Sequence, residues 1–119
     1  METVNLQQKF ANFSEHYKPH IIGEVNDCYV KVVKLKGEFI WHHHENEDEL
    51  FLVVKGTLRM KFRDREAVVR NGEFVIVPRG VEHCPVADEE VHIVLIEPKS
   101  TLNTGNITNE RTVAQLEQI

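Results

Sequence analysis

Short apolar segments separated by turn residues make up most of this chain. The stretches rich in Val, Ile, Leu and Phe are 20–25, 28–36, 38–44, 49–55, 57–63, 66–70, 74–78 and 91–97. Turn signals such as Asn26-Asp27, Lys55-Gly56 and Asn71-Gly72 lie between them, and no helical period connects one stretch to the next. Turns that recur roughly every 8 to 12 residues predict an antiparallel β-sandwich or barrel.

Helical periodicity is found only near the two ends of the chain. Leu6, Phe10 and Phe13 are spaced so that they would share one side of a short helix. Near the other end, segment 110–119 would place its apolar residues on one helical face. We therefore expect a short helix before the first strand and a second one after the last.

Length and composition favour one globular domain. The chain has 119 residues, of which 41% are hydrophobic and 28% charged, as in soluble domains with a single core. We expect a single domain over residues 1–119. Its barrel would cover about 20–97, and a tail with the short helix would cover about 98–119.

Charge and hydropathy argue against two classes of partner. The net charge of −5 disfavours nucleic acid and anionic membrane surfaces, both of which require a basic face. No apolar run is long enough to span a bilayer, and the first residues lack the features of a signal peptide. We expect a cytoplasmic protein in which Cys28 and Cys84 are reduced thiols.

Histidines are concentrated in the middle of the chain, where five of the seven lie between positions 42 and 92. Side chains alternate along a strand, so His42 and His44 would share a face and His43 would point the opposite way. With a rise of about 3.3 Å per residue, the two imidazoles would lie about 7 Å apart and could converge on one atom.

Two further residues suit the same site. Glu49 begins an apolar strand, where a buried carboxylate is costly unless it is paired or bound to a metal. If Glu49 faces inward with Phe51 and Val53, it meets the two imidazoles. His83 follows the turn 78–80 at the start of another strand. Taken singly, such histidines are more often ordinary surface or hydrogen-bonded residues, so the pattern alone leaves both interpretations open.

The spacing of these residues resembles that of the cupin family, in which two motifs frame a metal site. The first motif runs Gly, five residues, His-x-His, three or four residues, Glu, six residues, Gly; this chain has Gly37, four residues, His42-His43-His44, four residues, Glu49, six residues and Gly56. The second runs Gly, five residues, Pro-x-Gly, two residues, His, three residues, Asn; this chain matches it with Gly72, Pro78-Arg79-Gly80 and His83, but has Ala87 in place of Asn.

By position, the resemblance implies that one divalent transition metal binds to His42, His44, Glu49 and His83. The one-residue shortening after Gly37 and the replacement at Ala87 do not affect a ligand position. Three imidazoles and one carboxylate suit Fe, Mn, Ni, Zn, Co or Cu rather than Ca or Mg. The resemblance also implies an all-β jelly-roll barrel, or double-stranded β-helix, with a small-molecule ligand inside, and a homodimer.

For function, the resemblance implies a metal-dependent enzyme that acts on a sugar or a hydroxy or keto acid by isomerase-, lyase- or dioxygenase-like chemistry. The alternatives are a non-catalytic metal- or small-molecule-binding module and a purely structural barrel. No catalytic base or nucleophile is evident beyond the ligand positions.

Three groups of side chains have roles that the sequence leaves open. A phosphosugar substrate would require basic residues that face the pocket, and the candidates are Lys34, Arg59, Lys61, Arg63 and Arg79. His43 should face outward, whereas His92 lies in a strand whose two faces the sequence does not distinguish. Met60 and Phe62 have the parity of interior residues, for which core packing is the default role.

Overall fold

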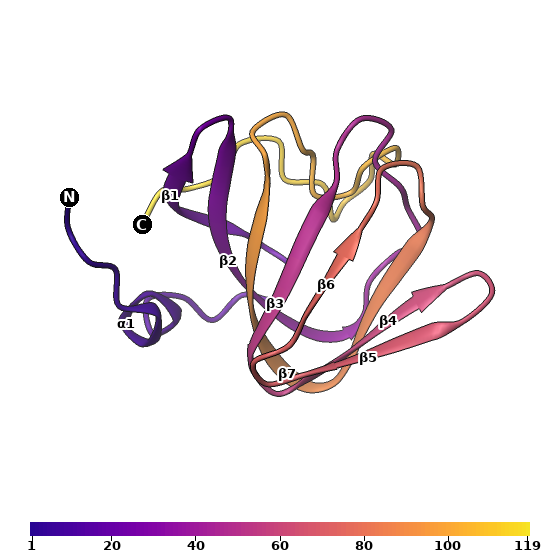
Figure 1. The fold of residues 1–119 in the computed structure, drawn as a ribbon, viewed down its shortest axis with the longest axis horizontal. Helices are drawn as coiled ribbons and strands as arrows, with labels where there is room; N and C mark the ends of the chain where they lie inside the picture. The colour runs from indigo at the N-terminus through magenta and orange to yellow at the C-terminus, as the bar shows by residue number, and fades with distance from the viewer.

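A computed structural model describes residues 1–119, and strands dominate it (Figure 1). The one helix, α1, is Leu6–Phe10, and the strands are β1 His20–Val25, β2 Cys28–Glu38, β3 Glu49–Lys55, β4 Thr57–Phe62, β5 Glu66–Arg70, β6 Phe74–Val77 and β7 His83–Pro98. The helix has five residues, far fewer than are needed to cross a bilayer.

All strand pairs are antiparallel, and β7 connects the two parts of the sheet. One path runs β1-β2-β7-β3-β6, while β4 pairs with β5 and with β7. β2 pairs with β7 along one edge, from Pro98 back to Val86, while on the other edge the last part of β7 pairs with β3 and its first part pairs with β4. The sheet therefore folds back on itself along β7, as Figure 1 shows, and the expected all-β jelly-roll architecture is confirmed.

Alternation along the strands separates an inner core from an outer face. In β3, Glu49, Phe51 and Val53 are buried and the residues between them are less so. The inner cluster contains 13 buried residues drawn from β2 to β7 and Tyr17. A smaller outer cluster places Phe10 of α1 against the outer face of β2 and β7. Glu49 therefore projects into the barrel interior.

The expected strand over residues 38–44 is not formed. The chain leaves β2 at Glu38, and the next contacts with β7 are from Phe39 to Pro85 and from His42 to His83. From Phe39 to His42 the chain advances three residues, while from Pro85 to His83 β7 advances only two, so a regular ladder of hydrogen bonds cannot continue. The expected strand 91–97 is instead the second part of β7.

The prediction of a helix in the C-terminal tail is wrong, whereas the prediction of a short N-terminal helix is confirmed. The tail runs through turns and ends beside β1, where Ile21 N donates to Glu117 O over 2.9 Å and Ile119 N donates to Ile21 O over 3.0 Å. β1 is an edge strand with free backbone groups, and an extended tail pairs with these groups where a helix could not. In α1, the Asn5 side chain accepts a hydrogen bond from Gln8 N over 3.0 Å and caps the helix.

Candidate metal centre

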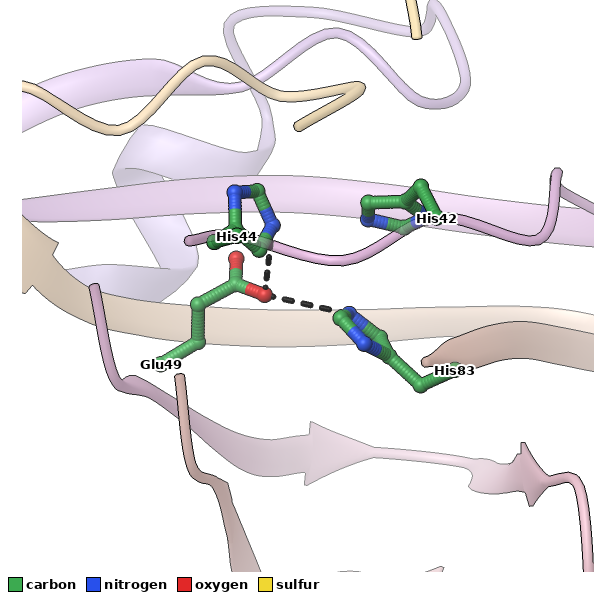
Figure 2. Close-up of side chains that lie close together, drawn as sticks. All are labelled: His42, His44, Glu49 and His83. Carbon is green, nitrogen blue, oxygen red and sulfur yellow. Dashed lines mark hydrogen bonds and ion pairs between the residues drawn. The ribbon is translucent and has the colours of Figure 1, made fainter. Parts of the chain in front are cut away.

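Four side chains converge inside the barrel (Figure 2). These four candidate ligands are His42, His44, Glu49 and His83. One possible ligand atom from each lies within 4.8 Å of all the others, and every one of the four residues is buried. The structure thus brings together all the residues that the sequence nominated.

Backbone pairing sets the positions of these residues. His42 N donates to His83 O over 3.1 Å and His83 N donates to His42 O over 2.9 Å, which makes the two an isolated antiparallel bridge. Glu49 is the first residue of β3 and His83 the first of β7. Glu49 and His83 therefore lie at the starts of strands, whereas His42 and His44 lie in the segment between β2 and β3 that this bridge ties to β7.

Two of the imidazoles are oriented by backbone carbonyls. His42 Nδ1 lies 3.0 Å from Ile40 O, and His83 Nδ1 lies 2.9 Å from Val81 O. A carbonyl oxygen can only accept, so each Nδ1 carries the proton and donates it. For His42, Nε2 is then left with a lone pair, the arrangement in which histidine binds a metal, whereas His83 Nε2 lies 3.1 Å from Glu49 Oε1.

The carboxylate of Glu49 lies between the other two rings, as the dashed lines in Figure 2 show. Its Oε1 is 2.9 Å from His44 Nε2 and 3.1 Å from His83 Nε2. Burial by itself raises the pKa of Glu49, but the contacts with His44 and His83 outweigh it and hold the pKa well below the usual value. Glu49 is therefore an anion inside the barrel.

Burial acts in the opposite sense on His42. Desolvation, followed by the proximity of His83, lowers the pKa of His42 to about 4, so its ring is neutral at physiological pH. His44 Nδ1 is buried and has no hydrogen-bond partner. A buried anion among imidazoles with free ring nitrogens is a donor set that fits a divalent transition metal.

A small cavity of about 40 Å³ is lined by two of the four candidate ligands, His42 and Glu49. Its polar lining groups include Tyr17, His42, Glu49, Glu97 and Asn103, and its apolar ones include Val33, Leu35, Phe39, Phe51 and Leu95. Since a single water requires about 10–15 Å³ by this measure, only a few heavy atoms fit in the space.

Glu97 and Lys31 are residues of this interior that the sequence analysis missed. Lys31 Nζ lies 3.3 Å from Glu97 Oε1, and both side chains are at most 3% exposed. Burial, and then the charge of Glu49, raise the pKa of Glu97 well above its usual value. The available signal was strand parity, because Glu97 follows the inward residues Ile93 and Leu95 at two-residue steps.

The basic residues considered for a phosphosugar do not line the cavity. Lys34 Nζ donates to Phe13 O, whereas Arg59, Lys61 and Arg63 pair with carboxylates on the surface. Arg79 is exposed in the loop that follows β6. Arg79 does line a second, more open pocket together with Glu49 and Glu97, so it is the one of the five cations that borders the site.

Two other histidines also lie outside the cavity, and two apolar residues belong to the core. His43 points away from the four candidate ligands, with its Nε2 2.6 Å from Glu45 Oε1. His92 stacks on Phe10, on the outer face, with ring centroids 4.6 Å apart. Met60 is fully buried in the inner cluster, and Phe62 packs against that cluster.

Comparison with known protein families matches residues 29–97 to the cupin domain. This match covers more than half of the chain and includes most of the sheet and all four candidate ligands. The chain therefore belongs to the cupin family.

Several individual proteins resemble the chain. A cupin-2 domain protein from Shewanella frigidimarina shares 45% identity and a TM-score of 0.80, over 82% of this chain and 95% of that one. A protein from Neisseria meningitidis shares 34% identity and a TM-score of 0.76, over 82% of this chain and 100% of that one. YdbB of Bacillus subtilis, an uncharacterized protein, is 40% identical over 79 residues, which are 66% of this chain and 64% of YdbB. The match thus spans less than two thirds of YdbB.

Proposed function

We propose that this chain is a metal-dependent cupin enzyme that acts on a small polar metabolite, such as a sugar or a hydroxy or keto acid. One divalent transition ion would bind to the four candidate ligands. The observation that carries the proposal is the convergence of three imidazoles and a carboxylate within 4.8 Å, all buried, beside a cavity. Nitrogen-rich sites with one carboxylate suit Fe, Mn, Ni, Zn, Co or Cu.

The cavity supports catalysis rather than a purely structural role for the ion. Four protein ligands leave positions free on an octahedral ion, and a catalytic site keeps such positions open. A bound ion would polarise a carbonyl or hydroxyl oxygen or lower the pKa of water. Phe51 and Leu95 give the cavity apolar walls, whereas Tyr17, Glu97 and Asn103 offer polar contacts to a substrate.

The charge distribution narrows the class of substrate. None of the five basic residues considered for phosphate recognition lines the cavity. An unphosphorylated sugar fragment or a short hydroxy or keto acid therefore suits the inner cavity, whereas a phosphate group would meet only Arg79, in a second pocket that Glu49 and Glu97 also line. The alternative is a non-catalytic module that holds a metal and a small ligand. The cavity volume of about 40 Å³ is compatible with this module and argues against an enzyme that takes large substrates.

Metal content and turnover test the proposal together. The protein is purified without a nickel column and its metals are measured by elemental analysis, before and after incubation with Mn²⁺, Fe²⁺ or Zn²⁺. The loaded protein is then incubated with small sugars, hydroxy acids and keto acids, and Glu49→Gln serves as the matched inactive variant. We expect one ion per chain and turnover that is lost in Glu49→Gln.

The two versions of the proposal give different results. Stoichiometric metal without turnover of any compound would favour the binding module. Absence of stoichiometric metal, with no uptake on titration, would contradict both versions.

A further inference from the structure

Two sets of backbone hydrogen bonds anchor the histidine run before β3. In the first set, His42 exchanges two hydrogen bonds with His83, and Gly80 N donates to His44 O over 2.7 Å. In the second set, the backbone of His43 meets the C-terminal tail. The residue between two candidate ligands is therefore held by a part of the chain that lies beyond the last strand.

Asn106 makes both contacts of the tail with His43. Its side-chain Oδ1 accepts a hydrogen bond from His43 N over 2.9 Å, and its backbone N donates to His43 O over 3.0 Å. Two such bonds exchanged with one residue are the pattern of an antiparallel strand pair, here with an amide oxygen in place of one backbone carbonyl. The histidine run thus has hydrogen-bonded neighbours from two parts of the chain, as a central strand does.

The tail is shaped to fit against the histidine run. Gly105, with φ +57°, approaches so closely that a Cβ at this position would lie 3.2 Å from Cδ2 of the His42 ring. Thr104 is fully buried, and its Oγ1 donates to Ile107 O over 2.6 Å across the turn that contains Asn106. The tail therefore contacts both the backbone of the run and the ring of one candidate ligand, and its own hydrogen bonds hold it in place.

We infer that Asn106 is a positioning residue of the metal centre, because its two hydrogen bonds to His43 set the spacing and direction of His42 and His44 for one ion. This inference rests on the proposed function, since it requires that both imidazoles bind the metal. Asn106 acts through the backbone of His43 and not as a ligand. It lies beyond residues 29–97, which match the cupin domain, so the two cupin motifs do not contain it.

The loss of this contact should affect metal binding more than folding. The hydrogen bond from His43 N to Asn106 is exposed, so without the Asn106 side chain water can replace it. The two imidazoles would then be anchored by the first set of bonds alone. Because a metal ion requires its ligands in a fixed geometry, ordering a looser segment would reduce the free energy of binding. Loss of a group that orients a ligand weakens metal binding by about 10–100-fold.

Three substitutions in the full chain test this inference. Asn106→Ala removes the oxygen that accepts from His43 N, whereas Asn106→Asp keeps an oxygen at the same place. Asn109→Ala is the matched control, because Asn109 Oδ1 accepts from Arg111 N over 2.8 Å, which is the same kind of bond within the tail itself. Competition with a chelating dye measures the affinity for Zn²⁺. Visible absorption of the Co²⁺-loaded proteins reports the geometry of the ligands.

We expect Asn106→Ala to weaken Zn²⁺ binding by about tenfold or more and to change the Co²⁺ spectrum. Asn106→Asp should bring both measurements back toward the wild-type values, because a carboxylate oxygen also accepts a hydrogen bond. Asn109→Ala should leave both unchanged. Thermal melting of the metal-free proteins shows whether each variant is folded.

Several results would overturn the inference. These are an unchanged Zn²⁺ affinity or an unchanged Co²⁺ spectrum in Asn106→Ala, an equal loss of affinity in Asn109→Ala, and a loss in Asn106→Asp as large as that in Asn106→Ala. An Asn106→Ala protein that does not fold would also overturn it, since Asn106 would then serve the fold rather than the site. Failure of the wild-type protein to take up Zn²⁺ would instead refute the proposed function, so the two failures are distinguishable.

Discussion

His42 and His83 exchange two backbone hydrogen bonds, of 3.1 and 2.9 Å, and their imidazole rings lie with centroids 4.3 Å apart. The backbones, and not the side chains alone, therefore hold the two rings together. One ring comes from the histidine run before β3 and the other from the start of β7. The segment that carries His42 and His44 is consequently tied to the sheet by this bridge, and Glu49 and His83 belong to strands of the sheet itself.

Removal of one candidate ligand should abolish tight metal binding. We expect His83→Ala to weaken Zn²⁺ binding by more than about 100-fold, because losing a neighbour of a ligand already costs 10–100-fold. His43→Ala is the matched control, since His43 belongs to the same histidine run but points away from the site. Chelator competition measures both affinities. Equal losses in the two variants would contradict the assignment of ligands.

Breaking the buried ion pair should cost more stability than removing it. Lys31→Met leaves Glu97 without its cation, for which we expect a loss of about 3–5 kcal/mol in the free energy of unfolding. Lys31→Met/Glu97→Leu should recover most of that loss, because neither charge then remains buried. Urea denaturation of the wild type, both single variants and the double variant measures the coupling. Additive single losses would show that the two residues do not interact.

Tyr17 should make the protein less stable at alkaline pH. Its hydroxyl donates to Gly37 O over 2.5 Å, and burial raises its pKa well above the ordinary value near 10. Above about pH 10 the unfolded chain releases the phenolic proton, whereas the native chain keeps it. The free energy of unfolding therefore falls by up to about 1.4 kcal/mol for each pH unit.

The matching variant is Tyr17→Phe, which lacks the titrating proton. At pH 8 the wild type should be more stable than the variant by about 1 kcal/mol, the typical value of one hydrogen bond. This advantage should shrink as the pH rises above about 10. Urea unfolding at a series of pH values measures it, and Tyr29→Phe controls for loss of a phenol elsewhere. A constant difference between wild type and Tyr17→Phe would contradict the prediction.

Gly105 should tolerate no side chain. It has φ +57°, and a Cβ there would lie inside the contact distance of His43 O, near the ring of His42. We expect Gly105→Ala to destabilise the protein by about 1–3 kcal/mol and to weaken Zn²⁺ binding as well. Gly72→Ala is the control, because Gly72 has φ +80° but nothing within 4 Å of the added carbon. Similar stability and similar Zn²⁺ affinity in both variants would show that this contact is unimportant.

The homodimer remains a proposal, and we propose the outer face of β6, β3 and β7 as its interface. Phe74 and Ile76 of β6 are 60% and 51% exposed, and Ile96 of β7 is 37% exposed. Leu50 pairs with both Ile76 and Ile96, so these side chains form one apolar surface next to an edge strand. We expect Phe74→Lys to shift the mass in light scattering toward the 13.8 kDa monomer, whereas Val68→Lys on β5 should not. A monomeric wild type would refute the proposal.

Strand parity predicted how three of the four candidate ligands are oriented, whereas the shared metal site with His83 was implied by the resemblance to the cupin motifs. Alternation alone separates His43 from His42 and His44 and places Glu49 on the side of Phe51 and Val53, as observed. The predicted orientation of His42 and His44 is found even though residues 38–44 form no regular strand, because a bridge ties His42 to β7.

Long-range register could not be predicted in the same way. The role of Glu97 depends on Lys31, which lies 66 residues earlier, and on β7 being placed between β2 and β3. No local pattern contains that information. The helix expected in the tail failed for a related reason, since the free edge of β1 binds Glu117 and Ile119 in an extended form, and that edge is a property of the finished sheet.

The position of β7 has a consequence for the kinetics of folding. β2 and β3 have no direct pairing and are joined only through β7, the last strand along the chain. The core therefore closes in a late step that depends on contacts between distant residues, and such topologies fold slowly. That step also brings His83 to its three partners, so a bound ion would slow unfolding by opposing the detachment of one strand. Metal occupancy would then set the lifetime of the native state.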